Sequence, residues 1–547
     1  MLPAGLVLFV LSSLCSVGKT SPVQLPLALS PGTRHSNMYY RSGSAESTAC
    51  HRRKPKKEKE RGGLYGLPYG DCDSPFALTN FTLDFLEKHW AKELDFVIWT
   101  GDSARHDNDR EIPRTPDEIY ELNRAMAHRM NEVFTSRGIP VVPTLGNNDV
   151  WRPNSITNEF SSIWRTFIPF ESFQVFQRGG YYSVEVIPNE VAVISLNTMY
   201  FYDSNKAVGG CEYGDDDDPG NLQFDWLEVQ LDRYRERSLQ VWVSGHVPPS
   251  PGNYFPGCFV RYADLALRYQ DTILGHLFGH MNVDHFFFLE SEDTILPDDD
   301  LSATRRKDEI DEQSHSSLAE VLFEDFSALP KKAKTDLDEY AIINVGPSVV
   351  PNPYLPTFRV YAYNATGKAD TDDEGMDEMK KKKKEKKKEP KRKHGHRHPG
   401  RETKIDCKKK ANRSTWACRP QKPHYASKNS PSRHNTRWTP LGYAQYWLPG
   451  LADISKNTKP KFKLEYTTMS KRDARLLFPM KELPKSFRND GGDDGAEVAK
   501  KKKGRKYTPY GLSDLTIGSY LSLARRLGDS KEGRVRALFR RYMYQEM

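Results

Sequence analysis

Phe96-Val97-Ile98-Trp99-Thr100-Gly101-Asp102-Ser103-Ala104-Arg105-His106-Asp107 is the stretch that decides the fold. It predicts a short buried strand that ends at Gly-Asp and is followed by polar, ionisable residues. Apolar runs of this length are typical of a parallel sheet, whose functional side chains gather at the carboxyl ends of the strands. An aspartate at such an end can bridge two metal ions, because each carboxylate oxygen can bind one. Since Gly-Asp is also ordinary turn chemistry, a metal site requires further ligands elsewhere in the chain.

Three later apolar runs also end in a glycine followed by an oxygen or imidazole ligand: Gly146-Asn147-Asn148-Asp149, Gly245-His246 and Gly279-His280. Helical patterns alternate with the early strands, which predicts an α/β fold with these strand ends lined up. Mixed Asp, Asn and His ligands without a thiolate suit Mn, Fe or Zn. A neutral Asn carbonyl beside a bridging carboxylate limits the negative charge of the site and leaves the metals Lewis acidic.

The chain has 547 residues, enough for one large domain or two ordinary ones, and a net charge of +8. A basic balance fits an anionic partner without specifying it. Residues 2–17 are apolar and have the length of a signal-peptide core, so we expect entry into the secretory pathway. Because no Lys or Arg precedes them, an uncleaved signal-anchor is an alternative, and an N-terminal strand is another. No other segment of the sequence is apolar for long enough to span a bilayer.

Cysteines and glycosylation triplets fit the same pathway. Beyond Cys15 in the leader, the cysteines are Cys50, Cys72, Cys211, Cys258, Cys407 and Cys418. An even number in an oxidising compartment predicts disulfides. The nearest pairs are Cys50 with Cys72 and Cys407 with Cys418, and Cys211 with Cys258 would remain, although the sequence does not prove the connectivity. The N-glycosylation triplets begin at Asn80, Asn364 and Asn412.

Together these motifs resemble the calcineurin-like metallophosphoesterase superfamily, whose pattern is Asp-x-His, Gly-Asp, Gly-Asn-His-Asp/Glu, His and Gly-His-x-His. The finer resemblance is to the fungal endopolyphosphatases, relatives of the acid sphingomyelinase-like phosphodiesterases. Ala49-Cys50-His51-Arg52, Asp71-Cys72-Asp73-Ser74-Pro75 and Gly442-Tyr443-Ala444-Gln445-Tyr446-Trp447 also carry it. The resemblance implies a four-layer α/β/β/α sandwich of two mixed sheets. It also implies two divalent ions (Mn, Fe, Zn, Co or Mg) and a place in the vacuole lumen or membrane.

The predicted organisation follows from this resemblance and from changes in composition. It comprises a leader at 1–18, a metallophosphoesterase domain at 40–367 with a polar insertion at 292–334, a Lys/His-rich disordered insertion at 368–410, the C-terminal part of the catalytic region at 411–480, a charged linker at 490–506 and a helical tail at 507–547. Within the tail, residues 515–539 are expected to form a helix.

The resemblance also assigns roles to the site residues. Asp102 becomes the metal bridge, and Asn147, His246 and His280 become the other ligands of the second metal. His106 stands where the sphingomyelinase-like relatives carry a catalytic histidine, so it is expected to protonate the leaving oxygen or hold a phosphate. The alternative is a histidine that merely pairs with Asp107.

Two further residues are candidate substrate contacts. Asn148 occupies the superfamily's usual catalytic histidine position. Arg105 is expected to contact a phosphate, with a solvated arginine as the alternative.

Two departures from the family pattern concern the first metal. No strand ending in Asp-x-His precedes Cys50, and no Asp occurs before Asp71. His35 is the candidate for the missing histidine, and either a skipped exon or an impaired enzyme explains the loss. Asn282 stands where the final metal-binding histidine belongs and is a candidate ligand through its carbonyl. The first metal site is therefore expected to be incomplete.

The implied activity is hydrolysis of internal phosphoanhydride bonds of inorganic polyphosphate by a metal-activated hydroxide. The alternatives are a phosphodiesterase acting on a sphingomyelin-like or nucleotide substrate, and a polyphosphate-binding protein without catalysis. The Lys-rich residues 380–393 either hold the flanking polyanion by counterion release or form a solvated insertion or processing site. No specific nucleic acid partner is expected, and membrane association is expected only through the N-terminal apolar segment.

Overall fold

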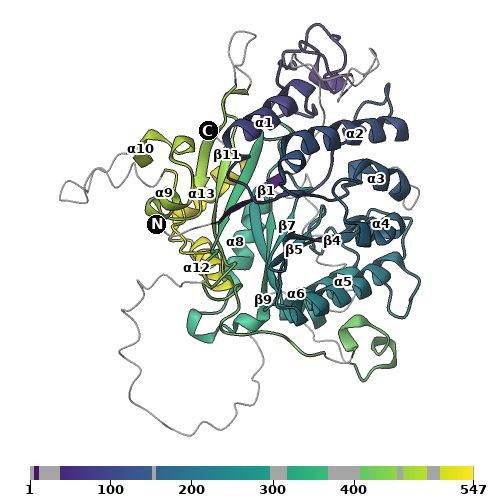
Figure 1. The fold of residues 1–547 in the computed structure, drawn as a ribbon, viewed down its shortest axis with the longest axis vertical. Helices are drawn as coiled ribbons and strands as arrows, with labels where there is room; N and C mark the ends of the chain where they lie inside the picture. The colour runs from purple at the N-terminus through teal and green to yellow at the C-terminus, as the bar shows by residue number, and fades with distance from the viewer. Residues whose placement is uncertain are drawn as a thin grey trace, which may run out of the picture.

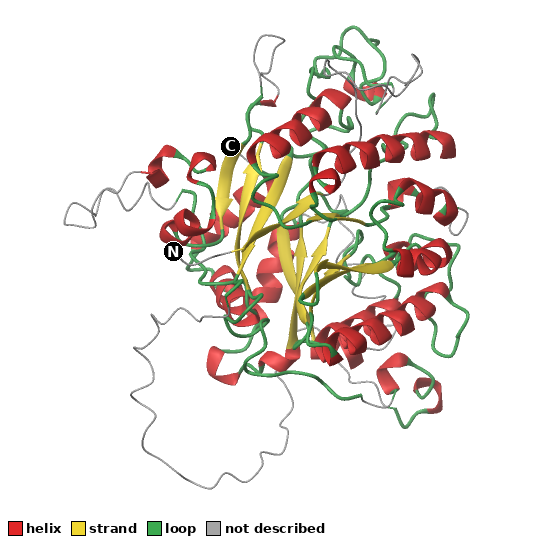
Figure 2. Cartoon of the chain, in the orientation of Figure 1, coloured by secondary structure: helices red, strands yellow, loops and turns green. Residues whose placement is uncertain are grey.

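A computed structural model of the chain describes residues 5–11, 37, 39–150, 156–295, 317–366, 407–419, 422–451, 460–488 and 506–545. Two six-stranded sheets lie at its centre, and helices lie outside them (Figure 1, Figure 2). The sheets face each other: Trp242 of the second sheet packs on Tyr361 of the first, with 5.9 Å between ring centroids. The predicted α/β fold of two mixed sheets with outer helices is confirmed.

The first sheet consists, in order across it, of β12 (Lys463–Thr467), β11 (Pro440–Trp447), β10 (Thr357–Tyr363), β1 (Gly5–Leu11), β2 (Val97–Trp99) and β3 (Val141–Pro143). Its β1, β2 and β3 run parallel, whereas β10, β11 and β12 continue the sheet by antiparallel pairing. Every residue of β2 and β3 is buried, as their continuous apolar runs predicted.

The second sheet consists, in order, of β4 (Tyr182–Ile187), β5 (Val191–Ser195), β6 (Gln240–Ser244), β7 (Ile273–Phe278), β9 (Tyr340–Val345) and β8 (His285–Glu290). Strands β5, β6, β7 and β9 run parallel, and β4 and β8 pair antiparallel at the two edges. The carboxyl ends of β6 and β7 are therefore neighbours, and each leads directly into a Gly-His pair.

Helices cover the outer faces of both sheets. In Figure 1, α1 to α6 run from the top down the right-hand side and the others lie on the left. Leu227 and Leu231 of α5 pack in one core with Ile194 and Val243 of the second sheet. The helices are α1 (Phe76–His89), α2 (Pro116–Val133), α3 (Thr157–Ile163), α4 (Phe173–Gly179), α5 (Pro219–Glu236), α6 (Pro256–Arg268), α8 (Leu318–Ala328), α9 (Lys471–Leu477), α10 (Lys485–Arg488), α12 (Ile517–Gly528) and α13 (Gly533–Tyr544).

The N-terminal apolar segment contributes a central strand. Residue 10 of β1 pairs with Arg359 of β10 on one side and with Ile98 of β2 on the other. This is the strand that the sequence left as an alternative to a leader. The other residues of the expected leader lie outside the described ranges, so its cleavage or anchoring stays a prediction. No helix in the part of the chain that the structure describes is long and apolar enough to cross a membrane.

Two sequence-based boundaries are wrong. The expected polar insertion at 292–334 contains α8, whose Leu322, Phe323 and Phe326 are buried in the main core beside α12, so this part belongs to the fold. The expected tail helix at 515–539 is two helices, α12 and α13, separated by residues 529–532. Most of the Lys/His-rich insertion and of the charged linker lies outside the described residues.

Three disulfides form with the pairing expected from spacing: Cys50–Cys72, Cys211–Cys258 and Cys407–Cys418. They indicate an oxidising compartment, which fits the secretory pathway.

The three candidate glycosylation asparagines differ in burial. Asn80 and Asn412 are half-buried. Asn364 is buried, and its amide nitrogen donates to Asn435 at 2.8 Å, so glycosylation at all three positions stays a prediction.

A truncation tests the central position of β1. Removal of residues 1–12 exposes the backbone edges of β10 and β2, and each buried hydrogen-bonding group left unpaired costs about 1–3 kcal/mol. We expect the refolded truncated chain to unfold at a clearly lower urea concentration than the full chain, measured by tryptophan fluorescence. Removal of residues 1–4 alone is the matched control and should leave the midpoint unchanged. Equal midpoints for all three chains would show that β1 is not part of the sheet.

Candidate metal centre

Two glycines allow the ends of β2 and β3 to meet. A Cβ on Gly101 would lie 2.7 Å from the backbone nitrogen of Gly146, and a Cβ on Gly146 would lie 2.0 Å from Asp102 Oδ1. Gly101 and Asp102 both have positive φ, at 93° and 58°. Left-handed backbone is unfavourable for a residue with a Cβ, so the surrounding contacts must hold Asp102 in place.

The Asp149 carboxylate supplies those contacts. It is fully buried and accepts five hydrogen bonds, which is what makes a buried carboxylate tolerable. The donors are the backbone amides of Asp102 (2.8 Å), Gly146 (3.0 Å), Ser103 (2.9 Å) and Ala104 (3.1 Å), and the side-chain amide of Asn123 on α2 (3.0 Å). Asp149 therefore fixes both strand ends at once.

Asn148 sets the orientation of the Asp102 carboxylate. Its backbone amide donates to Asp102 Oδ1 at 2.8 Å and its side-chain nitrogen donates to Oδ2 at 2.9 Å. The Asn148 carbonyl and Oδ1 accept from one nitrogen of Arg114, at 2.7 and 3.1 Å. Because both ends of its side chain are engaged, Asn148 is a positioning residue, and the prediction of a direct substrate contact is not supported.

His246 presents a ring nitrogen to two oxygens. Its Nδ1 lies 2.7 Å from the Thr100 carbonyl, which can only accept, so Nδ1 carries a proton. Its Nε2 lies 2.9 Å from Asn147 Oδ1 and 3.1 Å from Asp102 Oδ2. Three groups with lone pairs therefore converge when the ring is neutral, and a cation or an added proton would stabilise such a cluster. Burial disfavours that proton, but the Asp102 carboxylate outweighs it and raises the pKa of His246.

His280 completes the set from the neighbouring strand end. Its Nδ1 lies 2.9 Å from Asn147 Oδ1, and its ring packs edge-on against His246. Burial lowers the pKa of His280 to about 3, so the ring is neutral and can offer a lone pair. The four predicted ligands of the second metal are thus adjacent. Within the described ranges, no group of three His, Cys, Asp or Glu residues alone is arranged to hold a metal, so the convergence depends on Asn147.

His106 pairs with Asp73 rather than with Asp107. Its Nδ1 lies 2.7 Å from Asp73 Oδ1, and its backbone amide donates to Asp73 Oδ2 at 2.8 Å. The Asp73 carboxylate raises the pKa of His106 to about 9, and about a third of the side chain is exposed (36%). Asp73 was visible in the sequence only as part of a family motif, without a role.

Arg105 does not face solvent or a ligand. It is fully buried, and its guanidinium pairs with Glu118 of α2 and donates to the carbonyls of His106 and Ile112. The prediction that Arg105 contacts a phosphate is therefore wrong. Its role is to fasten the loop after β2 to α2.

Arg114 is a buried arginine that has no carboxylate partner among the described ion pairs. Only 8% of it is exposed, its Nε has no hydrogen-bond partner, and one nitrogen donates to the carbonyls of Arg105 and Asn148. Its charge acts on His106, whose pKa it lowers slightly against the larger effect of Asp73. No motif in the sequence marked this residue, which lies in a polar loop.

Of the two candidate ligands of the first metal, Asn282 lies within the described residues and His35 does not. The Asn282 side-chain nitrogen donates to the Asn352 carbonyl at 3.1 Å, and its φ of 55° is left-handed. His35 lies outside the described residues, so its role stays a prediction.

Comparison with known proteins identifies several relatives, all named endopolyphosphatase, although no family model matches the chain. The Cryptococcus neoformans protein is 39% identical, over 90% of this chain and 88% of the relative. The Schizosaccharomyces pombe protein is 31% identical, over 90% of this chain and 81% of the relative. The Saccharomyces cerevisiae protein is 28% identical, over 91% of this chain and 82% of the relative. A solved dimetal phosphatase from Danio rerio is 13% identical with a TM-score of 0.28, covering 52% of this chain and 86% of that one, which is too weak a likeness to support an argument.

Titration of His106 tests the pairing with Asp73. In the metal-free chain we expect NMR of the imidazole to report a pKa near 9, and in Asp73→Asn a pKa that falls towards 6.5, because the carboxylate is removed. Asp71→Asn, an exposed neighbour, is the control and should leave the pKa unchanged. A pKa near 6.5 in the unaltered chain would contradict the pairing.

The same pair makes stability depend on pH. Since the pKa of His106 is raised on folding, the ion pair stabilises the fold fully below about pH 6.5, and this contribution disappears as the pH rises through about 9. The difference in unfolding free energy between the unaltered chain and Asp73→Asn should therefore shrink over that interval in urea titrations.

Proposed function

The chain belongs to the endopolyphosphatase family, and from this we propose that it hydrolyses internal phosphoanhydride bonds of inorganic polyphosphate and releases shorter chains. The observation that carries the proposal is the placement of Asp102, Asn147, His246 and His280 around one point, with a protonated His106 four residues after Asp102. We further propose the vacuole as the compartment, within the secretory route that the disulfides indicate.

The donor set fits one divalent ion held by Asp102, Asn147, His246 and His280. The fit rests on His246, whose Nδ1 is committed to Thr100 while Nε2 meets two oxygens. When bound, a divalent ion supplies Lewis-acid polarisation of a phosphoryl oxygen and lowers the pKa of a water. A second ion, which the family resemblance implies, would need ligands from residues 12–36. That segment holds no Asp or Glu and a single histidine, His35.

His106 is proposed as the general acid. Asp73 accepts from Nδ1 and keeps the ring charged at neutral and acidic pH, which leaves the Nε2 proton for the leaving phosphate oxygen. Asp73 also accepts a hydrogen bond from the His106 backbone amide. The same carboxylate therefore fixes the position of the His106 backbone and keeps its ring charged.

Arg114 is proposed as the phosphate-binding arginine in place of Arg105. A buried guanidinium without a carboxylate is costly unless an anion completes it. The proposal is supported by its hydrogen bonds to the carbonyl of Asn148, which orients Asp102, and to the carbonyl of Arg105, which precedes His106. In this proposal the charge of Arg114 binds the phosphoryl group that His106 protonates.

Product analysis tests the function. With divalent metal added, we expect purified protein to shorten long-chain polyphosphate to intermediate lengths on gels before orthophosphate accumulates. Asp102→Asn should lower kcat/KM by about 1,000-fold or more, because it removes the carboxylate shared by the metal centre. Asp117→Asn, on the exposed start of α2, is the control. Turnover of a nucleotide or sphingomyelin-like diester but not of polyphosphate would favour a phosphodiesterase, and binding without turnover would favour a non-catalytic protein.

Arg114→Gln tests the arginine. Loss of a charged hydrogen bond of about 1.5–3 kcal/mol predicts a fall in kcat/KM of roughly 10- to 150-fold. Arg114→Lys should recover part of the lost activity because lysine keeps the positive charge. Recovery should be incomplete because lysine lacks the planar guanidinium that can donate two hydrogen bonds to one phosphate. Arg110→Gln, an exposed arginine of the same loop, is the matched control. Full activity in Arg114→Gln would exclude Arg114 from phosphate binding.

A further inference from the structure

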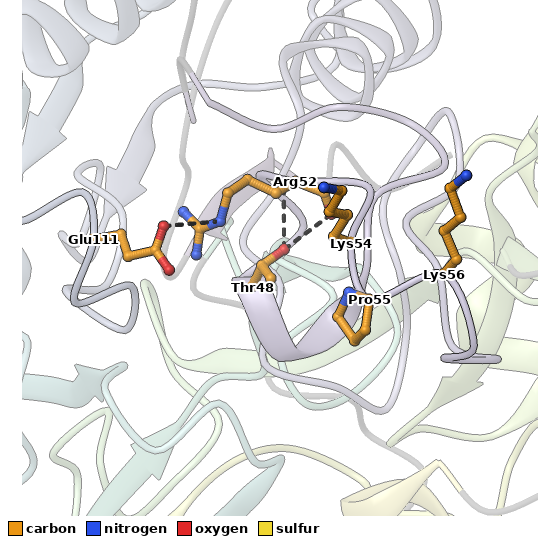
Figure 3. A pocket seen from close by; sticks show the side chains of 6 residues that line it. All are labelled: Thr48, Arg52, Lys54, Pro55, Lys56 and Glu111. Atoms are coloured by element: carbon orange, nitrogen blue, oxygen red, sulfur yellow. Dashed lines mark hydrogen bonds and ion pairs between the residues drawn. The ribbon is translucent and has the colours of Figure 1, made fainter.

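An open hollow of about 550 Å³ lies outside the metal centre, between residues 48–56 and Glu111 (Figure 3). Its volume falls within the range of ligand sites, about 300–1,000 Å³, but its walls are charged where small-molecule sites are mostly apolar. In Figure 3, Arg52 reaches towards Glu111 on one side, and Lys54 and Lys56 project on the other. The lining residues are Thr48, Arg52, Lys54, Pro55, Lys56 and Glu111.

The hollow is built on a braced loop, residues 46–61, which we call the basic loop. Arg61 donates to the carbonyls of Gly43, Arg53 and Pro55, at 3.1, 2.9 and 2.7 Å. Ser47 bonds to Glu58 through its backbone amide at 2.9 Å, and Cys50 is cross-linked to Cys72. These hydrogen bonds and the disulfide give the loop a defined shape, so the positions of its lysines are set by the fold.

Two contacts fasten the basic loop to the loop that carries His106. Arg52 donates both terminal nitrogens to Asp109, at 2.7 and 2.9 Å, and His51 Nδ1 lies 2.7 Å from the same carboxylate. On the other side of the Cys50–Cys72 disulfide, Asp73 holds His106. The hollow is therefore held at a fixed position beside the proposed acid, on the side of Asp109 and Glu111.

The charge of the hollow favours an anion. Residues 52–61 include seven basic and two acidic residues. Lys54 and Lys56 are exposed and form no ion pair with any residue in the described ranges. Exposed lysines alone are usually just solvated. Here two of them share a hollow whose arginine is already committed to Asp109, so their charges remain available to a ligand.

We propose that the basic hollow binds linear polyphosphate beyond the bond that is cut, as an anchor for long chains. The inference rests on the proposed function and adds a binding site to it. Because Asp109 joins the basic loop to the loop that carries His106, an extended polyanion that passes His106 on this side would reach Lys54 and Lys56. No aromatic side chain lines the hollow to stack on a base, so a plain phosphate chain fits better than a nucleic acid.

Binding to the metal-stripped full chain separates this inference from catalysis. We expect the double variant Lys54→Ala/Lys56→Ala to bind fluorescently labelled long-chain polyphosphate about tenfold more weakly, measured by anisotropy. The slope of log affinity against log salt should fall by about two, because two phosphates are no longer neutralised by a lysine. Tripolyphosphate is expected to be too short to occupy the metal centre and the basic hollow together. It should therefore bind the unaltered chain and the double variant equally. The matched control is Lys331→Ala/Lys332→Ala, two exposed lysines before the amino end of β9, and it should behave as the unaltered chain.

Each outcome decides the proposal. Unchanged affinity and salt slope in Lys54→Ala/Lys56→Ala would overturn it, as would an equal weakening in the control pair, which would show unspecific charge attraction. Equally tight, equally lysine-dependent binding of single-stranded oligonucleotide would overturn the assignment to polyphosphate. Absence of hydrolysis in the metal-loaded chain would refute the proposed function alone, because the binding measurement contains no turnover. If both hold, the double variant should raise KM for long chains and leave kcat unchanged.

Discussion

The buried Asp149 carboxylate is the interaction on which the centre depends. Strands β2 and β3 belong to one sheet, but their ends carry a left-handed Asp102 and a turn at Asn147 that have no strand partners. The Asp149 carboxylate accepts hydrogen bonds from the backbone amides of both strand ends. Gly101 and Gly146 have no Cβ, so the two ends can approach each other closely. The positions of Asp102 and Asn147 are consequences of that arrangement. His246 and His280 then arrive from the facing sheet, whose parallel strands end at the same edge.

A second layer of contacts links the centre to the N-terminal disulfide. Cys50 and Cys72 each stand next to a residue that bonds the loop after β2: His51 next to Cys50, and Asp73 next to Cys72. One cross-link therefore sets the position of the proposed acid and of the basic hollow together. Arg105, by contrast, fastens the same loop to α2 from inside. The buried Arg105 and the partly exposed His106 are therefore adjacent in the chain but paired with carboxylates of different segments.

The sequence predicted what depends on local pattern and missed what depends on the path of loops. The four strand ends were predictable because each joins an apolar run to a glycine and a candidate ligand, and the two facing sheets bring these ends together. The partner of Arg105 is Glu118 in the first turn of α2. The sequence between them does not reveal that the loop after β2 brings these two side chains together. The same reason hid Asp73 as the partner of His106 and Arg114 as a buried cation. The apolar run at the N-terminus fits a leader and a strand equally well by composition, since its neighbours in the sheet come from distant segments.

The place of β1 has a consequence for how the chain is made. Residue 10 pairs with Arg359, and β11 and β12 complete that half of the sheet only near residue 467. Strand β1 therefore has β2 as a partner early in synthesis, but its other neighbour, β10, lies several hundred residues later in the chain. Contacts of such long sequence separation are slow to form, and an unpaired apolar strand is prone to the wrong neighbours meanwhile. Completion of the first sheet is thus a late step, and the edge of β1 that faces β10 stays unpaired until residues 357–363 have been made.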